Sequence, residues 1–362
     1  MKKRITALLL LFTLSVTSLL ACTSADKPES ATGKTSKTSK SINDKKTDLT
    51  PVTLNEVAHS IFYAPMYVAM EKNYFEKEGI DLSLVTGFGA DKTMTAVLSG
   101  TADIGFMGSE ASIYTYNEGA RDYVVNFAQL TQRAGNFLVA RDDIKNFKWE
   151  DLKGKKVIGG RKGGMPEMVF EYILKQNHID PASDLTIDQN IDFGSTAAAF
   201  SEEKADYDFT VEFEPGATNL EKQGKGYVVA SLGTDSGYVP YTAFSAKKSY
   251  ISQHPEIIQG FTNALQKGMN YVASHTPEEI AQTIAPQFKE TTPDTITTIV
   301  SRYYEQDTWK KDLIFRQESF DLLQDILEDA GELRKRAPYK DLVTTTYAEN
   351  SAKPVKNTTL SH

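Results

Sequence analysis

The sequence contains one cysteine, Cys22, and five histidines. A lone cysteine can form neither a disulfide nor a cysteine-based metal site within one copy of the chain. The histidines have no metal-ligand spacing, and the chain has no phosphate-binding P-loop and no GxSxG nucleophile turn. We therefore expect that the chain is not an enzyme and that it uses no metal or other cofactor.

Long apolar runs are absent after the first residues. A positive head at 2–4 precedes an apolar stretch at 5–21, which predicts a secretory signal over 1–22. The letters Leu-Leu-Ala-Cys at 19–22 resemble the lipobox of bacterial lipoproteins. That resemblance implies acylation of Cys22 and an extracytoplasmic protein anchored to the outer face of the cell membrane. The alternative is an ordinary cleaved signal with a chance cysteine.

Residues 23–50 contain very few apolar side chains and consist mainly of Ser, Thr, Lys and Asp. Such a segment buries too little surface to offset its ordering entropy, so we expect a flexible tether. The whole chain carries a net charge of −8, and both the leader and the tether are positive. The remainder is therefore acidic, which argues against a nucleic-acid partner.

The body alternates strand-like and helix-like segments and ends in helices, which predicts an α/β fold. We expect lobe I at 51–138, lobe II at 139–240, a return to lobe I with C-terminal helices at 241–350, and a tail at 351–362. Extended segments near 137–141 and 237–246 are the predicted crossovers, giving a two-strand hinge between the lobes.

Three local features of the body are specific enough to check. A helix is expected from Ala64 to Gly79, with proline near its start and glycine past its end. A strand is expected at 185–192. Thr276 and Glu279 have the spacing of a capping box, which predicts a helix start there.

Four blocks of sequence, in order, resemble one family. HSIFYAPMYVA at 59–69, continuing into YFEKEGI at 74–80, is the first. The others are LSGTADIG at 98–105, LKGKKV at 152–157 and HPE at 254–256. They resemble periplasmic solute-binding proteins of the branch for alkanesulfonates, taurine, nitrate and thiamine-pyrimidine precursors.

The resemblance implies a two-lobed periplasmic-binding-protein type II fold without catalysis. It also implies a small-molecule ligand and the permease and ATPase subunits of an ABC importer as partners. We expect a monomer that touches the membrane only through its lipid anchor.

In such folds, ligand contacts come from loops at the carboxyl ends of strands. This placement predicts the following ligand-binding residues: His59, Ser60, Tyr63, Gly108, Ser109, Glu110, Lys162, Gly163, Gly164, Glu212, Glu214, Tyr238 and Tyr241.

Several of these residues have an alternative structural role. His59 and Ser109 would also serve as caps of a turn and a helix. Gly163 and Gly164 would also serve only to turn the chain into a helix. Glu214 lies in a Phe-Glu-Pro element that resembles a structural element of the family. The nearby Phe62 and Tyr67 are expected in the core rather than at the ligand.

The predicted site residues suggest a type of ligand. Glu110, Glu212 and Glu214 would repel an anion, and carboxylates among aromatic rings suit a flat ligand that donates N–H groups. A thiamine pyrimidine precursor fits, whereas Lys162 beside Gly163 would favour a sulfonate, taurine or nitrate. Two further classes remain open: a surface adhesin or sensor, and a pyrimidine-synthase-like enzyme, although the cysteine cluster of that enzyme is absent.

Overall fold

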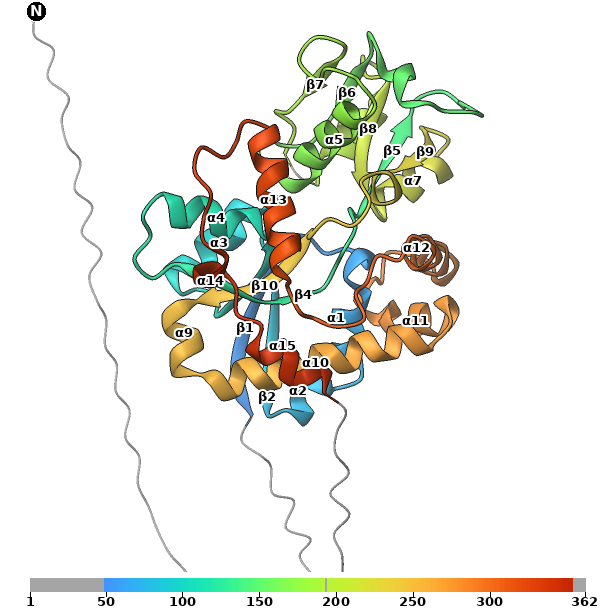
Figure 1. Ribbon diagram of the computed structural model, residues 1–362. Helices are drawn as coiled ribbons and strands as arrows, with labels where there is room; N and C mark the ends of the chain where they lie inside the picture. The colour runs from blue at the N-terminus through green and yellow to red at the C-terminus, as the bar shows by residue number, and fades with distance from the viewer. Residues whose placement is uncertain (1–48, 193, 354–362) are drawn as a thin grey trace, which may run out of the picture. The chain divides into compact units, whose positions relative to one another are not determined.

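Two mixed five-stranded sheets organise the described part of the chain, residues 49–192 and 194–353, in this computed structural model (Figure 1). These residues belong to one compact unit, 47–362. The predicted secretory signal, Cys22 and nearly all of the predicted tether lie outside the described residues.

The first sheet has the strand order β2-β1-β3-β10-β4, and β10 is antiparallel to both of its neighbours. Its strands are β1 (Thr50–Glu56), β2 (Ile80–Thr86), β3 (Ile104–Gly108), β4 (Val124–Gln129) and β10 (Thr242–Lys247). At its centre, Leu54 is fully buried and lies opposite Leu84 and Ile104.

The second sheet repeats this plan with the order β7-β6-β8-β5-β9, and here β5 is the strand antiparallel to both neighbours. Its strands are β5 (Asn136–Ala140), β6 (Lys156–Ile158), β7 (Thr186–Asp188), β8 (Phe209–Phe213) and β9 (Tyr227–Ser231). We call each sheet with its contacting helices a lobe: the first lobe contains β1 to β4 and β10, and the second contains β5 to β9.

The chain passes between the sheets twice, after β4 and before β10. In this way β10 follows the second sheet along the chain but pairs within the first. The structure therefore confirms the predicted α/β fold with two lobes. The first crossing was predicted near 137–141, but Asn136–Ala140 forms β5 within the second sheet, so the chain crosses between β4 and β5 instead.

Helices flank both sheets (Figure 1). Those of the first lobe are α1 (Ala64–Glu71), α2 (Tyr74–Lys77), α3 (Ala90–Ser99), α4 (Glu110–Asn117), α9 (Lys248–Gln253), α10 (Pro255–Ser274), α11 (Pro277–Ile284), α12 (Pro293–Glu305), α14 (Tyr339–Leu342) and α15 (Thr346–Ala352). Those of the second are α5 (Met165–Gln176), α6 (Thr196–Ser201), α7 (Gly216–Lys222) and α8 (Leu232–Asp235), while α13 (Gln317–Asp329) contacts both α4 and α5. Short 3-10 helices lie at Ile61–Tyr63, Trp149–Leu152 and Ala285–Gln287.

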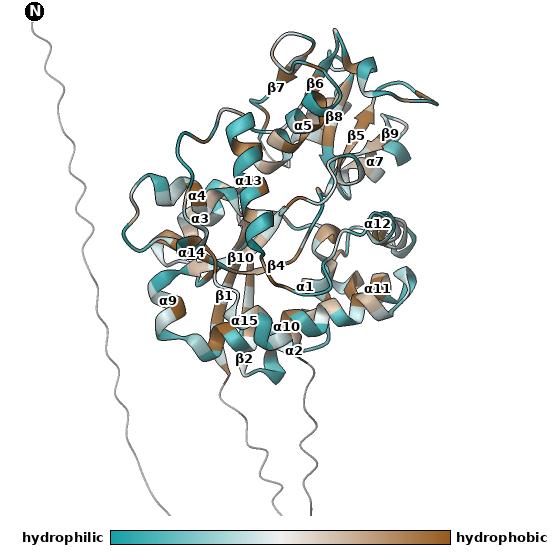
Figure 2. Cartoon of the chain, viewed as in Figure 1, coloured by the Kyte–Doolittle hydropathy of each residue, from teal (hydrophilic) through white to brown (hydrophobic). Residues whose placement is uncertain are grey.

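Hydrophobic residues concentrate in the strands, whereas helices such as α13 and α15 carry hydrophilic stretches (Figure 2). The longest helix, α10, packs on α1, and the contact is close at Gly268. A Cβ atom added there would lie 2.1 Å from the carbonyl oxygen of Pro65, so the position has room only for glycine.

An aromatic cluster lies where the two lobes meet. The ring of Phe62 packs against the rings of Tyr63, Phe213, Tyr241 and Tyr303, with centroid distances of 5.1–5.8 Å. Phe62 is fully buried, as is Tyr67, which confirms the expectation that both belong to the core.

Of the three local predictions, one is confirmed and two need correction. Thr276 accepts a hydrogen bond from the Glu279 N–H, and Glu279 accepts one from the Thr276 N–H, so the capping box is present. The helix expected at 64–79 is split, because Asn73 adopts a left-handed conformation with φ of 54°. The strand expected at 185–192 is shortened to β7.

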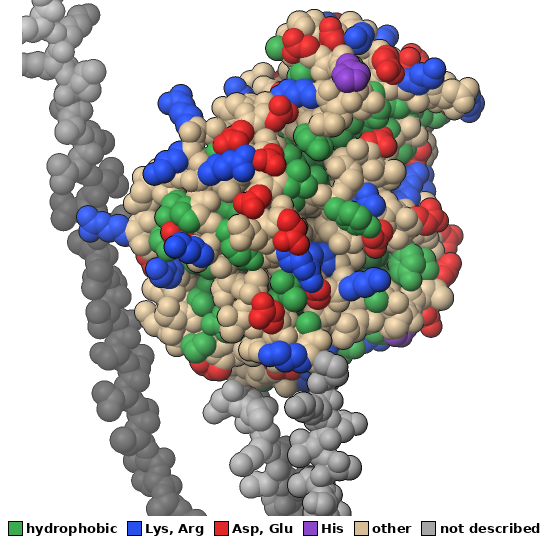
Figure 3. All heavy atoms as spheres, viewed as in Figure 1, with side chains coloured by type: hydrophobic (Ala, Val, Ile, Leu, Met, Phe, Trp, Pro, Cys, Tyr) green, Lys and Arg blue, Asp and Glu red, His purple; other side chains and the backbone are tan. Residues whose placement is uncertain are grey.

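Within residues 49–192 and 194–353, no helix combines the length and apolar character needed to cross a membrane. On the face of the molecule in Figure 3, acidic and basic side chains are interspersed.

Candidate ligand-binding site

A cavity of about 270 Å³ lies between the two lobes. The first lobe contributes the segment after β1 and the end of β3, and the second contributes the segment after β6 and the end of β8. Since these strand ends meet at the cavity, predicted ligand-binding residues from both lobes are brought together there.

Most of the predicted site residues line this cavity: His59, Ser60, Tyr63, Gly108, Glu110, Gly164, Glu212, Glu214 and Tyr241. Four others do not: Ser109, Lys162, Gly163 and Tyr238. The lining also includes residues that were not predicted, among them Phe88, Asn136, Arg161 and Thr196.

Glu110 is buried at the start of α4, and its Oε2 has no hydrogen-bond partner among the described residues. Burial raises the pKa of the Glu110 carboxyl to about 7, although the backbone N–H groups of Glu110 and Met165 and the charge of Arg161 lower it. The carboxyl is packed against Gly108, where an added Cβ would lie 2.1 Å from Oε2. Glycine at 108 therefore provides the space for this carboxyl.

Glu212, on β8, is the second buried carboxyl in the cavity wall. It accepts hydrogen bonds from the hydroxyls of Thr196 (2.9 Å) and Thr210 (2.6 Å). Burial raises the pKa of Glu212 to about 7, and the neighbouring charge of Glu214 contributes in the same direction. No described cation pairs with Glu212, so both lobes present to the cavity a carboxyl that lacks a counter-ion partner.

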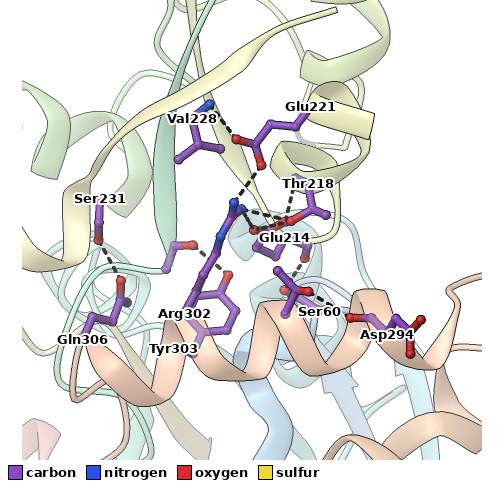
Figure 4. Close-up of polar contacts among 12 residues, drawn as sticks. Ser60, Glu214, Thr218, Glu221, Val228, Ser231, Asp294, Arg302, Tyr303 and Gln306 are labelled. Carbon is purple, nitrogen blue, oxygen red and sulfur yellow. Dashed lines mark hydrogen bonds and ion pairs between the residues drawn. The ribbon is translucent and has the colours of Figure 1, made fainter. Parts of the chain in front are cut away.

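Glu214 differs from these two carboxyls because its oxygens are already engaged. Its Oε2 accepts from the Thr218 N–H (2.9 Å), and its Oε1 accepts from the Thr218 hydroxyl (2.8 Å) and from Arg302 (2.8 Å). Arg302 extends from α12 toward α7 and also pairs with Glu221 at 2.7 Å (Figure 4). The Glu214 side chain therefore ties the two lobes together, in agreement with its alternative structural role.

Ser60 supports the same junction. Its hydroxyl donates to the carbonyl of Glu214 at 2.7 Å and accepts from the Phe62 N–H at 3.3 Å, capping the short helix that begins at Ile61 (Figure 4).

His59 is held by acceptors on both sides of its ring. Nδ1 lies 2.8 Å from Oε1 of Glu56, and Nε2 lies 2.9 Å from the carbonyl oxygen of Gln287. Hydrogen bonding to Glu56 raises the pKa of His59. This arrangement suits a doubly protonated ring, so His59 neutralises the buried Glu56 rather than offering a free acceptor to the cavity.

The residues outside the cavity have other contacts. The Ser109 hydroxyl donates to the carbonyl of Pro240 (3.4 Å) and makes no cap bond, so its alternative role as a helix cap is wrong. Lys162 is exposed and pairs with Glu332 at 3.5 Å. The Tyr238 hydroxyl donates to Asp307 at 2.6 Å.

Arg161, the residue before Lys162, places a guanidinium at the cavity wall. Its guanidinium pairs with Asp91 of α3 at 2.8 Å, and both side chains are about half exposed. This pair joins the two lobes at the cavity margin. The glycine-rich turn at 160–164 predicts that the backbone approaches the site, but it does not predict whether Arg161 or Lys162 lines the cavity.

Aromatic rings form much of the remaining wall. Tyr63 and Tyr241 are buried in the first lobe, and Phe213 ends β8 in the second. The Tyr241 hydroxyl donates to Oδ1 of Asn136. The cavity thus combines flat apolar surfaces with carboxyl groups that have acceptor capacity to spare.

The family model described as NMT1/THI5 like matches residues 61–280. The chain therefore belongs to the NMT1/THI5-like family.

One curated relative is similar over most of its length. The chain is 47% identical over 301 residues to "Putative binding protein YtlA" of Bacillus subtilis (strain 168), covering 83% of this chain and 90% of that protein.

Solved structures share this fold, among them two binding proteins. The alkanesulfonate-binding protein SsuA from Xanthomonas axonopodis pv. citri, bound to MOPS, has a TM-score of 0.66 at 15% identity and covers 82% of this chain and 98% of that chain. The nitrate-binding protein NrtA from Synechocystis PCC 6803 has a TM-score of 0.68 at 16% identity, and the match covers 84% of this chain and 89% of that chain.

Proposed function

We propose that this chain is the extracytoplasmic solute-binding component of an ABC importer, and that it binds a small, flat, nitrogen-rich ligand such as a thiamine pyrimidine precursor. Membership of the NMT1/THI5-like family and a fold shared with binding proteins for alkanesulfonate and nitrate support the transport role. The cavity between the lobes is of a size suited to a small molecule.

One observation carries the choice of ligand: Glu110 and Glu212 face the same cavity, both buried and neither paired with a cation. A ligand with N–H donors satisfies these carboxyls, whereas an unpaired buried carboxyl is costly. Tyr63, Phe213 and Tyr241 line the cavity and give its wall an aromatic surface against which a planar ring can pack. An aminopyrimidine meets both requirements.

The second candidate is an aliphatic sulfonate, taurine or nitrate. Arg161 at the cavity wall favours it, because a guanidinium is a good partner for oxyanions. Arg161 is already paired with Asp91, however, and the two buried carboxyls oppose an anion. The nitrogenous ligand is therefore preferred.

The remaining parts of the proposal concern the cell surface. Lipidation of Cys22 would anchor the protein outside the membrane, and the 23–50 tether would let a monomeric body reach the permease and ATPase subunits. Binding without chemistry is sufficient for this role.

A thermal-shift panel tests the choice of ligand. Hydroxymethyl- and formylamino-pyrimidines should give a saturable shift, and taurine, alkanesulfonates and nitrate should give none. Glu212→Gln should weaken pyrimidine binding by about 10- to 100-fold, the effect of losing a hydrogen bond to a charged group. Lys162→Met is the matched control, because this cation was predicted at the site but lies outside the cavity, and it should bind as the wild type does.

Two results would contradict the proposal. A shift with sulfonates or nitrate alone, lost in an Arg161→Met variant, would replace the ligand with an anion. Equal affinity of Glu212→Gln and the wild type for the pyrimidine would remove Glu212 from the site.

A further inference from the structure

Glu110 occupies an unusual position for a buried carboxyl. It is the first residue of α4, directly beyond the end of β3, and its carboxyl folds back over Gly108. The side chain is 2% exposed, and Oε2 has no partner among the described residues. The carboxyl therefore belongs to the cavity wall, while Oε2 itself is buried against Gly108 and makes no hydrogen bond to a described residue.

A second helix begins close to this carboxyl. Met165 starts α5 of the second lobe, and its N-cap Gly164 lines the same cavity. The backbone N–H groups of Glu110 and of Met165 both stabilise the charged form of the carboxyl, and the Arg161 charge acts in the same direction. Helix N-termini with free N–H groups and a nearby guanidinium are the arrangement that binds oxyanions in proteins.

We propose that the Glu110 carboxylate occupies an oxyanion position between the N-termini of α4 and α5 and thereby excludes acidic ligands from the cavity. The proposal rests on the solute-binding function above and adds a specificity-determining residue to it. An incoming sulfonate, carboxylate or nitrate meets a covalently attached anion where its own charge would be best stabilised. A neutral or cationic ligand meets no such repulsion from the Glu110 carboxylate.

A purely structural role for Glu110 fits the contacts less well. If the carboxylate served to stabilise the N-terminus of α4, its charged form would be favoured by folding. Folding instead disfavours the charged form, because burial raises the pKa of Glu110 more than the two backbone N–H groups and the charge of Arg161 lower it. A buried group that costs stability at neutral pH and faces a cavity is better explained by ligand selection.

Anion binding to matched variants tests this proposal. Glu110→Ala removes the resident anion and leaves the two helix N-termini and Arg161, whereas Glu110→Gln removes the charge but keeps most of the volume. Glu212→Ala is the control, because it deletes a buried carboxyl from the same cavity at a site where only two short helices begin, α6 with six residues and α7 with seven. Titration calorimetry with taurine, methanesulfonate and sulfate is carried out on the purified protein at about one pH unit above the Glu110 pKa of about 7.

We expect no saturable anion binding to the wild type or to Glu212→Ala. Glu110→Ala should gain at least about ten-fold in affinity for one of the three anions, since the variant removes the repulsion between two like charges at this position. Glu110→Gln should show a smaller gain, and it decides the question if Glu110→Ala does not fold.

Three results would overturn the proposal: sulfonate binding by the wild type that Glu110→Ala does not improve, no gain in either Glu110 variant, or an equal gain in Glu212→Ala. The last result would show a general effect of cavity charge. Failure of the proposed nitrogenous ligand is a separate outcome. It would appear as a lack of pyrimidine binding by the wild type, independently of the anion affinities of the variants.

Discussion

Glu212→Gln should stabilise the ligand-free protein, and the gain should depend on pH in a defined way. Burial raises the pKa of Glu212 from its ordinary value of 4.5 to about 7 in the folded state. Below pH 4.5 Glu212 is protonated in both the folded and the unfolded chain, and its contribution to the unfolding free energy has its full stabilising value. As pH rises to 7, the unfolded chain ionises first, so this contribution is lost.

The magnitude follows from the size of the pKa difference. At about 1.4 kcal/mol per pKa unit, the interval from 4.5 to about 7 corresponds to roughly 3 kcal/mol of unfolding free energy lost by the wild type between pH 4.5 and 7. Glutamine does not titrate, so the variant should escape this loss. At pH 8 it should therefore be more stable than the wild type by up to this amount, while binding the nitrogenous ligand less tightly.

Urea unfolding of both proteins at several pH values between 5 and 8 measures this effect. His59 and Glu167, whose pKa values are also raised, contribute to the slope of the wild type, so the quantity to compare is the difference between the two proteins. Parallel profiles, with a constant difference from pH 5 to pH 8, would show that Glu212 does not titrate differently in the folded and unfolded states. That result would refute the reasoning from burial.

Three further predictions concern the junction between the lobes. Arg302→Met should lower the unfolding free energy by about 3 kcal/mol in urea unfolding, because it leaves the buried Glu214 carboxylate without its cation. Arg336→Met, which breaks a more exposed ion pair, should lower it by less than about 1 kcal/mol in the same assay. Equal losses in the two variants would contradict a structural role for the pair of Arg302 and Glu214. Phe62→Ala should cost about 3–5 kcal/mol as a core residue, and normal stability with lost ligand binding would show it to be a ligand platform instead. Breaking the half-exposed pair with Arg161→Met or Asp91→Asn should speed ligand dissociation by no more than about five-fold in stopped-flow measurements, and a much larger effect would mean that Arg161 contacts the ligand.

The sequence predicted the fold well where local signals are strong. The capping box at Thr276 and the alternation of strands and helices follow from short-range patterns, and they were confirmed. The break at Asn73 was missed because a single left-handed residue within an otherwise helical pattern leaves only a weak trace in sequence. The ends of short strands such as β7 depend on neighbours that are distant along the chain.

The same distinction applies to the site. Glu110 and Glu212 lie at strand ends, so a rule about topology was enough to place them at the cavity. The partnership of Glu214 with Arg302 joins residues far apart in sequence, and no local pattern encodes it. The choice between Arg161 and Lys162 depends on the backbone of a turn with positive φ at Gly160 and Gly163, which sequence does not specify in detail.

The most direct test of the central claim is native mass spectrometry of the protein purified without denaturation, with the mass of any released small molecule determined afterwards. The account predicts a monomer carrying one small nitrogenous ligand, with a mass matching an aminopyrimidine, and loss of this ligand in Glu212→Gln. A released sulfonate or nitrate, or a wild-type protein that takes up neither class when both are supplied, would contradict it.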